Sequence, residues 1–275
     1  MRIKTGFLLF FFILAVNVFG DAGLEILVEE NSSGLTIIKS SGTAKTLEIP
    51  DEIDGKPVTI IGDGAFTGKG LVEVVIPDSV TSIGDGAFSF NNLETVVIGD
   101  NVTSIGRGAF TGNKLVSATI GSGVETIGKG AFSNNRLSSI NIPDSVTVIG
   151  DYAFFNNKIK VIAIPDNVSL IGEGAFSGNR LTAVEVGSGV TTVGNGAFYN
   201  NKITTVTIPS SLENLGKRAF DARSPDGRIK GSINYTDEVG NVLFTTANDF
   251  DTYYKFNGKK PGKYLLSDGN WKLSE

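Results

Sequence analysis

Cysteine and histidine are both absent from the 275 residues of the chain. Without cysteine there can be no disulfide framework and no acylated cysteine to hold a lipid anchor. The two absences together remove the usual ligands of zinc, and the lack of histidine removes the usual general base of an enzyme. Serine and aspartate are plentiful, but only lysine or carboxylate groups remain to activate a hydroxyl, and no motif singles them out. We therefore expect no catalytic residues and no enzymatic activity.

Long apolar runs are scarce as well. The run over residues 7–19 follows two basic residues, ends at the small residue Gly20, and is too short to span a bilayer comfortably. This order of basic, apolar and small residues is typical of a secretory signal peptide. We expect residues 1–20 to be removed, and an uncleaved anchor is the alternative. The prediction implies export to the cell surface, the periplasm or the medium, with no membrane span after cleavage.

Basic residues are in the minority, with 24 Lys and Arg against 29 Asp and Glu and a formal net charge of −5. Removal of Arg2 and Lys4 would leave 22 basic against 29 acidic residues, a net charge of −7. A chain of this charge is unsuited to general binding of nucleic acid, whose phosphates attract cationic surfaces.

What the sequence has in abundance is one repeated phrase: a large apolar residue, Gly, two variable residues, and then Ala-Phe. A clear copy is Ile-Gly-Asp-Gly-Ala-Phe at 61–66. The phenylalanine recurs every 22 residues, at Phe66, Phe88, Phe110, Phe132, Phe154, Phe176, Phe198 and Phe220. A fixed period of this length predicts a solenoid of about eight rungs over residues 61–220.

Each copy also contains a short strand pattern. In one copy Leu137, Ile140 and Ile142 are apolar and the residues between them are polar, so we expect the three to face inward. Stacked rungs would pair these strands into a parallel sheet at ~4.8 Å per rung. The same stacking predicts a continuous column of phenylalanine rings, and glycines placed where a Cβ would obstruct the backbone.

The two ends depart from the repeat. Residues 24–28 and 35–39 predict two short strands separated by a turn, and the rung that follows is lengthened at 54–57 by Asp-Gly-Lys-Pro. We expect residues 21–60 to form an N-terminal cap with an incomplete first rung, because the apolar face of the first full rung needs a cover.

After Phe220 the phrase stops, and we expect residues 221–275 to form a C-terminal cap. A strand is predicted at 242–245, a short helix at 248–256 and a hairpin at 264–273. Most of the tyrosines and the only tryptophan lie in this part. The alternative is therefore a small ligand-binding module whose exposed aromatic residues make the contacts.

The repeated pattern Leu-x-x-Ile-x-Ile-Pro, followed by Ser-Val-x-x-Ile-Gly-x-x-Ala-Phe, resembles the BspA-like (treponemal-type) leucine-rich repeat family over about residues 47–220. The resemblance implies a mainly β, right-handed leucine-rich-repeat solenoid, and an exported bacterial protein that binds host or microbial surface molecules. One departure is that family repeats often carry Cys shortly after Ala-Phe. The matching positions here hold Asn91, Asn113, Asn135, Asn157, Asn179 and Asn201. We expect these amides to bond buried backbone groups.

The outward-facing residues of the predicted strands are the first candidate binding surface. Leucine-rich repeats commonly dock partners on this concave sheet, yet the residues here are small, β-branched and almost uncharged, and lack Trp, Tyr or Arg anchors. A plain sheet surface is the equal alternative. The residues are Glu73, Val75, Thr95, Val97, Ser117, Thr119, Ser139, Asn141, Val161, Ala163, Ala183, Glu185, Thr205 and Thr207.

A cationic row is the second candidate. It consists of Lys114, Arg136, Lys158, Arg180 and Lys202, one on each of five successive repeats. Stacked rungs would bring these charges within about 5 Å of one another, inside a Debye length, so that they could attract a polyanionic glycan or an acidic protein. Independently solvated turn residues are the alternative.

Neither the glycines nor the acidic residues predict a cofactor or metal site. The Gly-Asp-Gly at 62–64 lacks the third glycine and the Lys-Ser/Thr of phosphate loops. Asp78, Asp100, Asp144 and Asp166 could form a carboxylate row for calcium, but serines interrupt it. We expect each of these aspartates to cap its own turn.

These observations favour a non-catalytic, exported binding protein whose partner is a protein or glycan of a host or bacterial surface. The alternative is a structural or self-associating envelope protein that uses the solenoid as a rigid spacer. An enzyme is a third possibility, against which the missing base argues.

Overall fold

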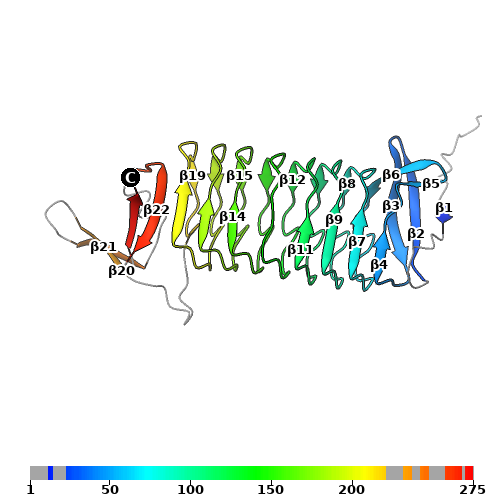
Figure 1. Ribbon diagram of the computed structural model, residues 1–275, viewed down its shortest axis with the longest axis horizontal. Helices are drawn as coiled ribbons and strands as arrows, with labels where there is room; N and C mark the ends of the chain where they lie inside the picture. Colours follow the sequence, from blue (N-terminus) through cyan, green and yellow to red (C-terminus); the bar gives the residue numbers. More distant parts are fainter. Residues whose placement is uncertain are drawn as a thin grey trace, which may run out of the picture.

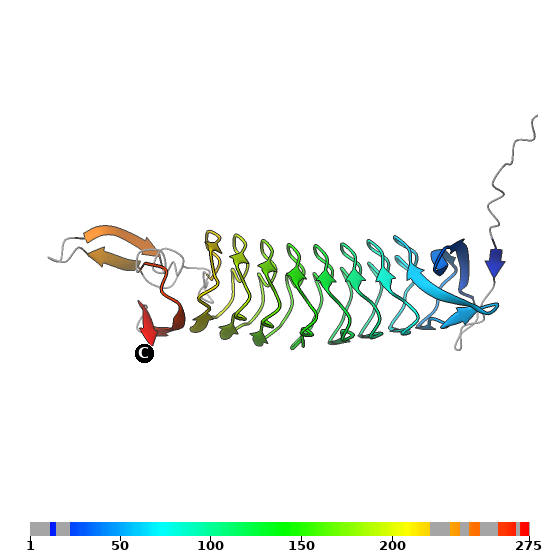
Figure 2. The same ribbon diagram turned by 90° about the horizontal axis from the view of Figure 1, so that it is seen from above.

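The computed structural model describes residues 12–14, 23–220, 232–236, 242–247, 258–267 and 270–274. These residues form a β-solenoid whose rungs follow one another along the long axis (Figure 1). Seen from above, the rungs overlie one another along a nearly straight line (Figure 2). No helix occurs in the described ranges, and the helix expected at 248–256 lies outside them.

One side of the stack carries the strands predicted from the repeat. They pair in parallel and in register, so that Val74 faces Val96 and Ile76 faces Ile98. Their Leu and Ile/Val positions are buried, as expected, and their alternate residues point outward. The strands are β4 (Thr46–Glu48), β7 (Glu73–Ile76), β9 (Thr95–Ile98) and β11 (Ser117–Thr119), then β14 (Val161–Ala163), β16 (Ala183–Glu185) and β18 (Thr205–Ile208).

This sheet is not continuous, which corrects the expectation of one sheet through every rung. Residues 137–142 form no strand, and the break separates β4-β7-β9-β11 from β14-β16-β18. Two features weaken pairing here. Ala118 supplies the smallest side chain of its column, and the next rung reads Ser-Ser-Ile-Asn at 138–141, where Ser and Asn have low strand propensity. Ala118 and Ile140 are accordingly only partly buried.

A second parallel sheet, which the sequence did not predict, runs through all the rungs on the opposite side. Each rung contributes only two residues, such as Ser104–Ile105, at the Ile that opens the repeated phrase. The strands are β6 (Lys56–Ile61), β8 (Ser82–Ile83), β10 (Ser104–Ile105), β12 (Thr126–Ile127), β13 (Val148–Ile149), β15 (Leu170–Ile171), β17 (Thr192–Val193) and β19 (Asn214–Leu215).

The phenylalanines lie between the two sheets in one stacked column. Consecutive ring centroids are 5.0–5.4 Å apart, and Phe88 and Phe110 are parallel to within 3°. All eight rings are at most 1% exposed. Full burial of a ring stabilises the fold by about 1.5–3 kcal/mol, so the predicted column is confirmed as the main apolar support of the stack.

The asparagine column supplies the polar support. The Nδ2 of Asn135 donates to the carbonyls of Phe110 (2.9 Å) and Phe132 (3.1 Å), while its Oδ1 accepts from the amide of Leu115 (3.0 Å). The other five asparagines repeat the donation to two phenylalanine carbonyls. Leaving such a buried group unpaired costs about 1–3 kcal/mol, which explains why Asn recurs at this turn.

The first glycine of the phrase is required by close approach. A Cβ on Gly128 would lie 2.6 Å from the carbonyl oxygen of Ile105, in the rung below. Its φ is not positive, so backbone contact rather than conformation selects glycine here. The second glycine, as at Gly130, has φ of +64°, and a Cβ there would meet only the Ser133 hydroxyl, at an ordinary contact distance of 3.5 Å.

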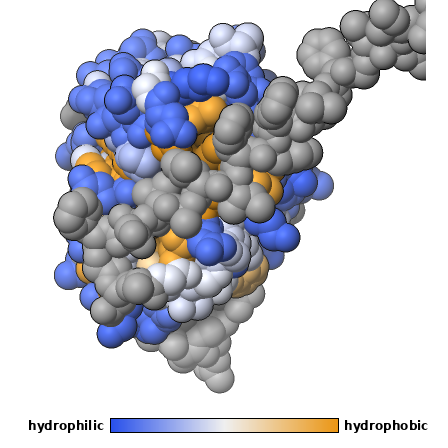
Figure 3. All heavy atoms as spheres, turned by 90° about the vertical axis from the view of Figure 1, so that its right-hand side faces the viewer, coloured by the Kyte–Doolittle hydropathy of each residue, from blue (hydrophilic) through white to orange (hydrophobic). Residues whose placement is uncertain are grey.

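Two strands at the N-terminal end continue into the first rung. Strands β2 (Glu25–Asn31) and β3 (Gly34–Ser41) pair antiparallel, and β3 joins β6 in parallel. The extra residues form β5 (Glu52–Ile53) and a hairpin to β6 across Asp54 and Gly55, both with positive φ. Seen from this end, hydrophobic side chains show between hydrophilic ones (Figure 3). Strand β1 (Phe12–Leu14), from the predicted leader, pairs antiparallel with β2.

At the C-terminal end, a strand from outside the repeat joins the last rung. Strand β22 (Gly262–Ser267) pairs antiparallel with β18, the last strand of its sheet, and with β23 (Asn270–Ser274), which confirms the predicted hairpin. A second hairpin joins β20 (Ser232–Thr236) and β21 (Val242–Ala247). Tyr264 is 0% exposed and belongs to the core, so it closes the stack and is not one of the exposed aromatic residues of the alternative interpretation.

Candidate functional surfaces

The outward face of the β7–β18 strands is open and carries few anchors. Most of its predicted residues are exposed or half-buried, and the apolar ones include Val97 and Val161, which is 61% exposed. Val75 pairs with Val97 across neighbouring strands, so a small apolar area lies there. The stack is nearly straight in Figures 1 and 2, and this face is therefore a broad surface without a deep concavity.

The cationic row lies along one edge of the stack. All five of its side chains are exposed. Each backbone amide donates to the leucine or isoleucine carbonyl one rung earlier, as Arg136 does to Leu115 (2.9 Å), so the row is held in register. The structure thus places the five residues on five successive rungs.

A groove of about 370 Å³ runs beside the middle of this row. It is lined by Arg136, Lys158 and Arg180 and by the amides of Asn134 and Asn156 among others. The Nδ2 of Asn156 donates to the Oδ1 of Asn134 (2.9 Å). Both asparagines have φ near +55°, where glycine stands in other rungs. The groove combines positive charge with amide donors and acceptors.

Phe90 lies near the start of the row and was missed by the sequence analysis. It is 68% exposed, and φ of 56° places it in the left-handed region. A Cβ added to Gly112 would lie 2.8 Å from the ring, so the ring covers the glycine of the next rung. Gly112 lies two residues before Lys114, so an apolar ring is close to the first cation of the row.

Three of the four aspartates bond to the next rung through their carboxylates, which corrects the expectation that each caps its own turn; they are Asp78, Asp100 and Asp166. The Oδ1 of Asp78 accepts from the amide of Asp100 (2.7 Å), and Asp166 does the same for Ser188 (2.6 Å). The bond from Ser188 lowers the pKa of Asp166 below its ordinary value of 3.8, because it stabilises the carboxylate. In the described ranges, no three acidic residues are grouped so as to hold a metal ion.

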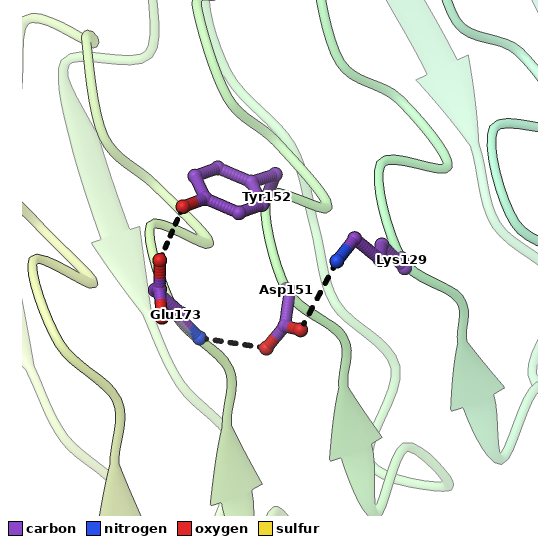
Figure 4. A network of polar contacts seen from close by, with 4 residues as sticks. All are labelled: Lys129, Asp151, Tyr152 and Glu173. Atoms are coloured by element: carbon purple, nitrogen blue, oxygen red, sulfur yellow. Dashed lines mark hydrogen bonds and ion pairs between the residues drawn. The ribbon is translucent and has the colours of Figure 1, made fainter.

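A third surface lies on the edge formed by the second glycine of the phrase. In one rung that position holds Tyr152, whose hydroxyl donates to Glu173 (Figure 4). This hydrogen bond, followed by burial and the negative charge nearby, raises the Tyr152 pKa above 10.0. Asp151 accepts from the amide of Glu173 (2.9 Å) and pairs with Lys129 (3.6 Å), whose Nζ also lies 5.7 Å from the Tyr152 ring centre.

The Tyr152 ring is held in place on several sides. It meets Phe155 edge to face at 5.9 Å, and a Cβ on Gly174 would lie 2.4 Å from it, so it covers the next rung. Three rungs on, Arg218 stands in the same position and stacks on Tyr199 at 4.4 Å. A hollow of about 310 Å³ lies between, lined by Tyr152, Glu173, Ser177, Tyr199, Lys217 and Arg218 with Gly174, Asn195 and Gly196.

The sequence contained a signal for this surface. Tyr152 and Arg218 replace a glycine that occupies the other six copies, and Phe155 and Tyr199 replace the Ser or Thr that follows the phenylalanine. A search for departures from the repeat would have found them, whereas a search for its regularities does not.

A comparison with known protein families finds a match to the repeats. A family model described as the BspA-type leucine-rich repeat region matches residues 38–160 and 147–245 in six copies. The chain belongs to this family. Membership confirms the predicted resemblance, and the repeats of the family are binding or scaffold modules.

A search of the solved structures matches other leucine-rich repeat proteins. A leucine-rich cell surface protein of Faecalibacterium prausnitzii is 25% identical, with 74% of this chain and 73% of that chain covered and a TM-score of 0.40. The leucine-rich repeat protein of T. pallidum is 26% identical, with 69% and 78% covered and a TM-score of 0.44. A Bacteroides ovatus protein is 20% identical, with 74% and 56% covered and a TM-score of 0.49. A search of the curated proteins found no match.

The described residues include no helix with the length and apolar character needed to cross a bilayer.

Proposed function

We propose that the protein is an exported, non-catalytic scaffold that binds polyanionic glycans of a host or microbial surface along its cationic row. The observation that carries the proposal is the register of Lys114, Arg136, Lys158, Arg180 and Lys202, which repeat one per rung beside a groove. Neighbouring rings of the core are 5.0–5.4 Å apart, which gives the rung spacing. A linear polymer with regularly placed negative charges matches such a row.

Local charge supports this assignment although the whole chain is acidic. The exposed cations are about one rung apart, closer than a Debye length of about 8 Å at physiological ionic strength, so their fields add. Phe90 offers an apolar contact at the same edge, and the amides of Asn134 and Asn156 offer hydrogen bonds to sugar hydroxyls. The strand face has no comparable charge.

The test is binding of dextran sulfate to the chain without residues 1–20, measured by calorimetry at two salt concentrations. Exchange of three row residues, Lys114→Gln, Arg136→Gln and Lys158→Gln, should weaken binding by about tenfold, since each exposed charge contributes about 0.2–1 kcal/mol. A matched control removes the same charge elsewhere, at Lys39→Gln, Lys45→Gln and Arg107→Gln. Equal affinities of the two triple variants would refute the proposal.

A second pair of changes tests the strand face. Thr119→Lys combined with Ser139→Glu alters that face without a change in net charge and leaves the row intact. If the row is the site, this variant binds dextran sulfate as the unmodified chain does. Loss of binding in this variant alone would move the site to the sheet.

A further inference from the structure

The hollow beside Tyr152 and the cationic row are formed by different positions of the repeat. The row follows the buried asparagine of each repeat, whereas the hollow is formed by residues on both sides of the Ala-Phe pair, two of which are Glu173 and Ser177. Its volume of about 310 Å³ is at the lower end of the range of small-ligand sites. It has room for a short stretch of a chain-like ligand.

Two glycines form the floor of this hollow. Gly174 and Gly196 occupy the same position as Tyr152 and Arg218 in the rungs between them and carry no side chain. Tyr152 therefore stands at one end of the hollow, with its ring over Gly174, and Arg218 stands at the other end. Tyr199 projects from the position after Phe198, and Arg218 stacks on its ring.

The tyrosine backbone is in an unfavourable conformation. Its φ of 56° is one that bulky residues rarely adopt, and glycine satisfies the same turn at Gly130 and Gly174. The fold therefore does not need a tyrosine at this position. Strained bulky residues of this kind concentrate at binding sites, where the surrounding contacts hold them.

The ring is also fixed in orientation. The carboxylate of Glu173 accepts a hydrogen bond from its hydroxyl, the Phe155 ring packs against it edge to face, and Gly174 lies beneath it. A half-exposed aromatic ring that is already immobilised loses little conformational freedom when a ligand stacks on it. The apolar C–H face of a pyranose sugar is the ligand surface that such a ring fits, because the sugar hydroxyls point sideways toward polar neighbours.

Those polar neighbours indicate a carboxylated sugar. Lys217 and Arg218 bring two positive charges to the hollow, whereas the one acid among its lining residues, Glu173, already accepts the tyrosine hydroxyl. We propose that this hollow binds a uronic-acid unit of a glycan chain, with the pyranose ring stacked on Tyr152 and the carboxylate directed toward Lys217 and Arg218. None of the five residues of the cationic row lines this hollow.

The test uses tetragalacturonate and a hyaluronan tetrasaccharide as probes in calorimetry at physiological ionic strength. Tyr152→Gly restores the residue of the other rungs and should weaken binding of both probes at least tenfold. Asp54→Gly is the control for relief of backbone strain, because Asp54 also has a positive φ, of 52°, and lies in the N-terminal hairpin, outside both candidate sites. This control should change the affinity for either probe less than twofold.

Three further measurements test the second aromatic ring, the role of the carboxylate, and the independence of this site from the cationic row. Tyr199→Ala, which leaves Tyr152 in place, should also weaken binding, and circular dichroism should show all variants folded. Tetragalacturonate with its carboxyl groups methyl-esterified should bind at least fivefold more weakly. Dextran sulfate, which has no carboxylate, should bind Tyr152→Gly as tightly as the unmodified chain, so that a failure of this site is distinguished from a failure of the row.

The proposal is overturned if neither uronic-acid probe binds at millimolar concentration, or if Tyr152→Gly and Asp54→Gly bind them equally. Equal binding of the esterified and free tetragalacturonates would overturn the assignment of the carboxylate.

Discussion

The two halves of the solenoid differ at the second glycine of the repeated phrase. In the first four rungs this position holds glycine with φ between 59° and 64°, as at Gly64 and Gly108. In the last four it reads Tyr152, Gly174, Gly196 and Arg218, with φ between 56° and 58°. The backbone is the same in both halves although the side chains differ.

This comparison separates what the stack requires from what it allows. The first glycine of the phrase, the phenylalanine and the asparagine are enclosed by the rungs on either side, so they cannot vary. At the second glycine of the first four rungs a Cβ would meet only a Ser or Thr side chain, at 3.4 Å or more, and the stacked backbone imposes its conformation even on bulky residues. Residues that carry a specific function are therefore expected at the second position.

The largest expected effect tests the common core of the two halves. Phe132→Ala and Phe176→Ala each remove a fully buried ring and should each lower the free energy of unfolding by about 3–5 kcal/mol. Urea unfolding followed by circular dichroism gives the values. A difference of several kcal/mol between the two would contradict the equivalence of the halves.

The same measurement extends to Phe220, the last ring of the column. The ring is only 1% exposed. We therefore expect Phe220→Ala to resemble Phe132→Ala, and a much smaller effect would show that the cap encloses the last ring poorly in solution.

A smaller loss of stability is expected from substitutions at the two glycines of one rung, and the two losses should differ. Gly128→Ala would place a Cβ 2.6 Å from the Ile105 carbonyl oxygen and should cost about 1–3 kcal/mol, because rigid backbone must shift. Gly130→Ala meets no atom closer than 3.5 Å and should cost only about 1 kcal/mol, from its left-handed conformation. Thermal unfolding of the pair checks the order, and a greater loss for Gly130→Ala would contradict it.

The position where the halves differ should affect stability least. Tyr152→Gly relieves about 1 kcal/mol of backbone strain and loses a hydrogen bond to Glu173 of similar size. The free energy of unfolding should change by less than about 1 kcal/mol. A loss as large as that of Phe132→Ala would show that the tyrosine is structural.

The smallest effect is a dependence on pH. The bond from Ser188 lowers the pKa of Asp166 in the folded state, so the folded state binds this proton less readily than the unfolded state. Its stabilising contribution is present above the unfolded pKa and is lost as pH falls through the folded pKa. Carboxyl titration by NMR should show the lowered pKa, and Ser188→Pro, which removes the amide donor, should return it toward 3.8. An unchanged pKa in this variant would contradict the assignment.

Much of the fold could be predicted because the period places identical residues in contact. Once Phe88 and Phe110 are 22 residues apart in an unbroken repeat, their stacking at 5.3 Å follows, and so does the bonding of the asparagines. The second sheet could not be predicted in this way. Its strands are two residues long, as at Ser104–Ile105, and show no alternation by which a strand is recognised.

The candidate surfaces were predictable to different degrees. The cationic row follows from the period alone, since one basic residue recurs in each rung. The aspartate bonds were wrongly predicted, because a turn sequence does not reveal whether its carboxylate reaches its own turn or the next rung. The hollow depends on Tyr152 lying over a glycine in the following rung, which only the stacked structure shows.

The central claim is that rungs of 22 residues are interchangeable units of one stack, and paired deletions test it most directly. Removal of residues 86–107 joins Asp85 to Gly108 and takes out one whole period, whereas removal of residues 86–106 takes out one residue fewer. We predict that the first variant unfolds cooperatively and that small-angle scattering shows a particle about 5 Å shorter, the spacing of one rung. The second shifts the register of every later column and should lose the cooperative transition. Equal behaviour of the two deletions would contradict the account.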